Sequence, residues 1–132
     1  MATLLVTLIV LHVLTGVFWA GSTFVLARTA GANAERLALP QFGAALLTLA
    51  LGTSIWAMAL SNVPAIPSIR VLGAGATCAL LAAIVQGLAL PAVRRLREQD
   101  PTAPRKRIAI HQRIASALLV VTVTCMALWS HI

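Results

Sequence analysis

The stretch TLLVTLIVLHVLTGVFWAGSTFVLA, residues 3–27, contains no lysine, arginine, aspartate or glutamate. It exceeds the ~20 apolar residues that a helix needs to cross the hydrocarbon core of a bilayer. Inside lipid a chain must satisfy its own backbone hydrogen bonds, which favours a helix. No basic residue precedes the stretch, and it is longer than the apolar core of about 7–15 residues in a signal peptide. The stretch therefore predicts a transmembrane helix.

The rest of the chain continues this pattern. Of its 132 residues, 60% are hydrophobic and 10% are charged, whereas a soluble domain has about 45–50% and about 25%. We expect four spans, at about residues 3–27, 41–61, 69–93 and 108–130. Because short connections make successive helices antiparallel neighbours, the sequence predicts one all-α domain, residues 1–132, folded as an antiparallel up-down four-helix transmembrane bundle.

The basic residues lie on one side of these spans. The net charge is +7, and the first and third loops hold most of it: Arg28, Arg36, Arg94, Arg95, Arg97, Arg105, Lys106 and Arg107. On the other side Arg70 is the only strong base. The positive-inside rule then places both basic loops in the cytoplasm and both termini outside. The expected partner of these bases is the lipid bilayer and not nucleic acid, because no basic stripe with interleaved aromatic residues is present.

Small and weakly polar residues recur at helical spacing, which marks helix–helix interfaces in membranes. The first two spans offer His12, Gly16, Trp19 and Thr23, and Gln41, Ala45, Thr48, Gly52, Trp56 and Ala59. The last two offer Arg70, Gly73, Ala76 and Thr77, and His111, Ala115, Leu118, Thr122, Cys125 and Trp129. Gln86, inside the third span, is expected to form hydrogen bonds across helices.

His12 is the main candidate for chemistry. At ~1.5 Å per residue it lies about 12–15 Å below the outer surface, where an ionisable group is costly. A neutral imidazole is a good ligand for haem iron or a transition metal. The alternative is a neutral ring that forms a hydrogen bond to a threonine or serine of a facing helix and only holds helices together.

Arg70 and His111 are weaker candidates. The Arg70 side chain can extend to the lipid headgroups or turn inward toward a carboxylate such as a haem propionate. His111 lies near the cytoplasmic start of the fourth span, and its depth differs from that of His12 by roughly 10–18 Å. We therefore expect His111 to be an interfacial residue or part of a separate site, and the second ligand at His12 stays unknown.

The first span continues into a motif that resembles a known family. LHVLTGVFWAGSTFVLAR is similar to the first helix of the HemJ-type protoporphyrinogen IX oxidases, with His12, Trp19, Gly21 and Arg28 in the same order. In SIRVL, Arg70 stands where that family usually has a lysine. The copper-resistance CopD-type membrane domain has a similar first helix.

The HemJ-type resemblance implies a b-type haem with His12 as an iron ligand. Arg70 would then hold a propionate, and Trp19 would form a wall of the pocket. It also implies a bacterial inner (plasma) membrane protein with a redox role, either a haem-dependent oxidoreductase acting on a porphyrinogen or quinol or an electron-transfer protein.

Two alternatives stay open. The CopD-type resemblance implies copper handling or transport, in which Met58, Met126, Cys78 and Cys125 would add soft ligands to His12. The other alternative is a cofactor-free structural or assembly subunit, acting as a homo-oligomer or within a membrane complex.

Overall fold

The computed structural model describes residues 1–96 and 102–132 and contains four helices and, among those residues, no strand. They are α1 (Ala2–Arg28), α2 (Ala34–Ala59), α3 (Pro67–Arg95) and α4 (Thr102–Leu128). All four are long and apolar enough to cross a membrane, which confirms the predicted all-helical class with four candidate spans.

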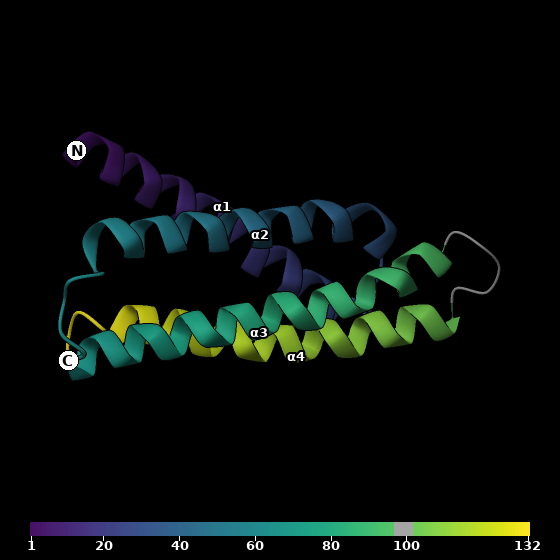
Figure 1. The fold of residues 1–132 in the computed structure, drawn as a ribbon. Helices are drawn as coiled ribbons and strands as arrows, with labels where there is room; N and C mark the ends of the chain where they lie inside the picture. Colours follow the sequence, from purple (N-terminus) through teal and green to yellow (C-terminus); the bar gives the residue numbers. More distant parts are fainter. Residues whose placement is uncertain (97–101) are drawn as a thin grey trace.

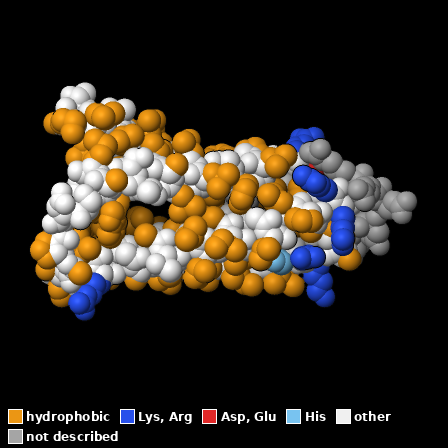
Figure 2. Space-filling model, in the orientation of Figure 1, with side chains coloured by type: hydrophobic (Ala, Val, Ile, Leu, Met, Phe, Trp, Pro, Cys, Tyr) orange, Lys and Arg blue, Asp and Glu red, His pale blue; other side chains and the backbone are white. Residues whose placement is uncertain are grey.

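The helices alternate in direction and so give the molecule two distinct ends (Figure 1). The terminal end holds both chain termini and residues 60–66, which connect α2 to α3. The basic end holds residues 29–33, which connect α1 to α2, together with the end of α3 and the start of α4. Lysine and arginine side chains gather at this second end (Figure 2). Arg97, expected among them, lies outside the described residues.

Helices α2 and α4 each begin about two turns before the apolar runs that marked the predicted spans. Pro40 was expected to precede the second span, yet it lies inside α2. Its side chain is exposed, and its missing N–H frees only the carbonyl of the exposed Arg36. The basic turn Arg105–Arg107 likewise belongs to α4. Both helices therefore extend through charged residues beyond their apolar runs.

The connection between α1 and α2 is short and tightly folded. The backbone N–H of Gly31 donates to Leu26 O at 2.9 Å, and Ala30 adopts a φ of 52°, as in a Schellman helix ending. Gly31 itself has a φ of 79°, and a Cβ there would lie 3.2 Å from Arg105 O. Only glycine combines this backbone conformation with such a close approach to α4.

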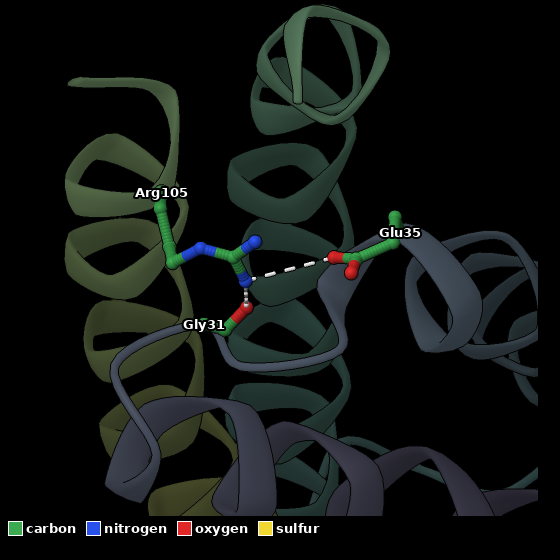
Figure 3. Close-up of polar contacts among 3 residues, drawn as sticks. All are labelled: Gly31, Glu35 and Arg105. Carbon is green, nitrogen blue, oxygen red and sulfur yellow. Dashed lines mark hydrogen bonds and ion pairs between the residues drawn. The ribbon is translucent and has the colours of Figure 1, made fainter. Parts of the chain in front are cut away.

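Arg105 joins this connection to the start of α4. Its Nη1 donates to Gly31 O at 2.7 Å and lies 3.6 Å from Glu35 Oε2 (Figure 3). Both charged side chains are about one-third exposed. Arg105 therefore holds the start of α4 against the connection between α1 and α2. The 2.7 Å hydrogen bond to Gly31 O contributes more to this contact than the 3.6 Å ion pair with Glu35, which is long and partly exposed.

The bundle consists of two hairpins, because α1 packs mainly against α2, and α3 packs mainly against α4. Small side chains let the helices approach closely. The core surrounds Trp19 with alanines and one leucine: Ala45, Ala79, Ala82, Ala83, Ala115 and Leu119. A second cluster, nearer the basic end, contains Leu26, Ala34, Ala38, Ala92, Val93 and Ile108.

The predicted inward faces were right for most helices and wrong for α3. On α2, Gln41, Ala45 and Thr48 are buried as expected. On α3, Arg70, Ala76 and Thr77 are exposed, and the buried face contains Ile69, Gly75, Ala79, Ala82, Ala83 and Gln86 instead. Small residues lie all around the start of α3, so their spacing alone did not identify the packed face.

The two hairpins meet in the basic half and separate in the terminal half. The buried residues of α1 begin at Trp19, and those of α2 end at Thr48. Within the second hairpin, α3 and α4 stay in contact further, because Thr122 Oγ1 donates to Gly75 O at 3.1 Å. Figure 2 shows the consequence as an opening between the hairpins in the half that holds the termini.

Candidate functional site

His12 lies in α1, in the half of the bundle where the hairpins separate. Its ring is half-buried, and its Nδ1 lies 2.9 Å from Thr48 O of α2. A carbonyl oxygen can only accept a hydrogen bond, so Nδ1 must be the donor. The neutral ring then carries no proton on Nε2, and this nitrogen keeps a free lone pair.

Glycine makes this position of the ring possible. A Cβ on Gly52 of α2 would lie 2.9 Å from His12 Cε1 and 3.4 Å from Nδ1. Real Cβ atoms do not approach other atoms closer than 3.0 Å, so the imidazole occupies the space that any larger residue would fill. Gly16 lies one turn further along α1 at the same contact. A Cβ on Gly16 would lie 3.6 Å from Thr48 Cγ2, which is an ordinary van der Waals distance. The predicted interface between these two stripes is confirmed.

Hydroxyl groups support the same contact. The Thr15 and Thr48 hydroxyl oxygens lie 2.9 Å apart across the helix interface, and Thr48 Oγ1 also donates to Ala44 O at 2.7 Å. These bonds fix the segment of α2 whose carbonyl accepts the His12 proton. In proteins, a histidine that binds a metal through one ring nitrogen commonly donates the N–H of the other ring nitrogen to a backbone carbonyl, which fixes the orientation of the ring.

The structure does not join the other ionisable candidates to His12. Arg70 is exposed in the first turn of α3, and within residues 1–96 and 102–132 its side chain has no hydrogen bond or ion pair. His111 is half-buried in α4, and its Nδ1 lies 2.8 Å from Arg107 O of the same helix. His111 thus has the local contact of a helix-surface histidine, whereas His12 reaches a neighbouring helix.

Two of the soft ligands expected for copper can be described individually. Both Cys78 and Cys125 are free thiols and half-buried. In the part of the chain that the structure describes, no group of three or more His, Cys, Asp or Glu side chains could hold a metal ion. Among the described residues, His12 is therefore not part of a metal site with three or more such side chains.

A polar layer lies closer to the basic end than His12 and involves all four helices. It consists of Trp19, Thr23, Gln41, Gln86 and Gln112, each at most 3% exposed. Trp19 Nε1 donates to Gln86 Oε1 at 2.6 Å, and Gln86 Nε2 donates to Thr23 Oγ1 at 2.8 Å. The expected hydrogen bonding of Gln86 across helices is confirmed.

The two remaining glutamines of the polar layer join the hairpins directly. Gln41 Nε2 donates to Gln112 Oε1 at 3.0 Å, and Gln112 Nε2 donates back to Gln41 Oε1 at 2.9 Å. Gln41 also reaches Thr23 Oγ1 at 3.0 Å, and Gln86 reaches Gln112 Oε1 at 3.2 Å. None of the buried side-chain nitrogen or oxygen atoms of the layer lacks a hydrogen-bond partner. Such a closed network specifies how the two hairpins dock.

Trp19 is the residue of the polar layer that also belongs to the hydrophobic core. The residue is 2% exposed, and its indole N–H is bonded to Gln86. It lies two turns along α1 from His12, about 10 Å by helical rise. Trp19 therefore belongs to the core between the hairpins.

The sequence interpretation missed two residues of interest. Gln112 completes the polar layer, and the signal for it was a third amide within the predicted spans. Arg113, next to it, is an arginine inside the predicted fourth span, and its side chain is exposed on the surface of α4.

Comparisons with known proteins identify no relative of this chain. No protein-family model matches the chain, and no curated protein and no solved structure matches it.

Proposed function

We propose that this chain is a multi-pass protein of the bacterial inner membrane that binds a b-type haem through His12 Nε2 and takes part in a redox reaction. The basic end faces the cytoplasm, and both termini lie outside. The charge distribution supports this orientation, because among residues 1–96 and 102–132 Arg70 is the only lysine or arginine at the terminal end.

The observation that supports the ligand assignment is the hydrogen bond from His12 Nδ1 to Thr48 O. It fixes the ring and leaves Nε2 as the free donor atom, which is the arrangement that a metal-bound histidine needs. An ionisable side chain at this depth in a candidate span is a functional candidate by default. The purely structural alternative needs the same hydrogen bond but gives no role to the free Nε2.

The surroundings of His12 fit a haem better than a bare metal ion. Haem iron already has four porphyrin nitrogens, so one protein ligand suffices. The opening between the hairpins lies in the same half of the bundle (Figure 2). Arg70 lies in the same half and has no hydrogen-bond or ion-pair partner among the described residues. From the rise per residue, it is offset from His12 by about 10 Å along the bundle axis. We propose that it binds a propionate carboxylate.

When bound, the haem supplies one-electron redox chemistry that no side chain of this composition provides. The chain contributes the axial nitrogen, a fixed ring orientation and an apolar environment. A hydrophobic donor such as a quinol or porphyrinogen could reach the site from the bilayer. The HemJ-type resemblance of the first helix supports this substrate class.

A haem titration tests the ligand assignment. Hemin is added to the detergent-purified chain, and the Soret absorbance gives the Kd for the wild type, His12→Ala and the matched control His111→Ala. We expect saturable binding with a defined low-spin or high-spin spectrum, lost in His12→Ala and kept in His111→Ala. Equal binding by all three proteins, or copper bound in place of haem, would contradict the proposal.

The orientation has its own test. Thr29→Cys and Ser130→Cys place a thiol at the basic end and at the terminal end respectively. A membrane-impermeant maleimide added to spheroplasts should label Ser130→Cys and leave Thr29→Cys unlabelled until the membrane is opened. The reverse pattern would show that the topology is inverted.

A further inference from the structure

Arg113 interrupts the apolar outer face of α4. The residue is exposed, and its neighbours on that face, Ile110 and Ile114, are 46% and 47% exposed. A surface of this kind faces hydrocarbon in a membrane-spanning helix. A permanently charged guanidinium is costly there unless its long side chain reaches the headgroup region and meets an anion.

Lys106 offers a second cation on the same face. It precedes Arg113 by seven residues, which is two turns of helix and about 10 Å of rise. Both side chains are exposed. In the described parts of the chain, neither side chain has a hydrogen bond or an ion pair. Side chains of this length can converge on one group that lies between them.

Nothing acidic in the described chain is placed to neutralise this pair. Glu35 is the one acidic side chain in residues 1–96 and 102–132, and it lies beside Arg105. The first turn of α4 contains no acidic residue. Anionic phospholipids place phosphate groups at the level where the bases of a cytoplasmic helix end lie, and arginine binds phosphate well.

We propose that Lys106 and Arg113 together bind the phosphate of an anionic phospholipid, whose acyl chain lies along Ile110 and Ile114. The two cations recognise the headgroup, and the exposed isoleucines accept the chain. This site is separate from His12 and does not depend on the proposed haem.

Native mass spectrometry of the detergent-solubilised chain tests the proposal. Phosphatidylglycerol and phosphatidylcholine with the same acyl chains are titrated against the wild type, Lys106→Gln, Arg113→Gln and the control Arg36→Gln, an exposed base of α2 at the same end. A base near anionic lipid contributes about a fivefold change in affinity. We expect phosphatidylglycerol to bind more tightly, each α4 variant to lose about fivefold, and Arg36→Gln to stay within about twofold.

Three outcomes would overturn the proposal. Equal affinities for the two lipids would show that the headgroup is not recognised. An equal loss in Arg36→Gln and Arg113→Gln would indicate diffuse attraction to the basic end. Competition by inorganic phosphate at the same concentration as the lipid would show a free-anion site. Arg113→Lys, which keeps the charge, should retain most of the binding, and it excludes misfolding as the cause of a loss.

Discussion

Replacing Gln112 with leucine should destabilise the bundle, because this side chain makes two of the hydrogen bonds that join the two hairpins and a third bond within the second hairpin. It accepts from Gln41 Nε2 and Gln86 Nε2 and donates to Gln41 Oε1. Leucine has a similar volume, so the substitution removes the amide and leaves the space filled. The hydrophobic effect gives little compensation, because the surrounding lipid is as apolar as leucine.

The expected magnitude follows from the partners left behind. Gln41 Nε2 and Gln86 Nε2 still reach Thr23 Oγ1, but Gln41 Oε1 loses its partner in a fully buried position. Interhelical hydrogen bonds in membranes average about 0.6 kcal/mol, with a maximum near 1.7 kcal/mol. Three lost bonds therefore predict a loss of about 2 kcal/mol in the free energy of unfolding.

Equilibrium unfolding in mixed micelles measures this loss, with Thr124→Val as the control. The Thr124 hydroxyl donates only to Val120 O of its own helix and is exposed, so its removal should change stability by less than about 0.5 kcal/mol. A Gln112→Leu protein as stable as this control would refute the idea that the polar layer joins the hairpins.

The double variant Gln41→Leu with Gln112→Leu gives a sharper test of the same reasoning. The two single changes each remove the same pair of mutual hydrogen bonds. The double variant should therefore lose about 1 kcal/mol less than the sum of the single losses. Additive losses would mean that the two amides do not interact.

Two further changes act through glycine. Gly52→Ala places a Cβ 2.9 Å from His12 Cε1, so the ring must move away from Thr48 O. Hemin affinity in the Soret titration should therefore fall about 10–100-fold. An unchanged affinity would show that haem binding does not depend on this position of the ring. Gly31→Ala puts a Cβ on a residue with a φ of 79°, 3.2 Å from Arg105 O. The free energy of unfolding should therefore fall by at least ~1 kcal/mol. An unchanged free energy of unfolding would show that the connection between α1 and α2 can adjust to the side chain.

The sequence predicts the four helices well because their signal is long and depends only on composition. The apolar runs alone do not give the starts of α2 and α4, since backbone hydrogen bonding continues through the charged residues before each run. The sequence predicts the wrong face for α3. Around Gly73 and Ala76 every side of the helix has small residues, and only the partner helix determines which side is buried.

The candidate site is predictable only in part. His12 was identifiable because an ionisable side chain among apolar ones is unusual. Its contacts with Thr48 O and Gly52 were not, since they depend on the relative rotation and depth of α1 and α2. The role of Trp19 in the core depends in the same way on Gln86, which is distant in sequence.

The visible absorption spectrum of the chain, gently purified from haem-replete cells, tests the central claim most directly. We predict a Soret band with a b-type pyridine haemochrome signature, present in His111→Ala and absent in His12→Ala. A colourless wild-type protein with its four helices intact would contradict haem binding at His12 and leave His12 with the helix-contact role alone.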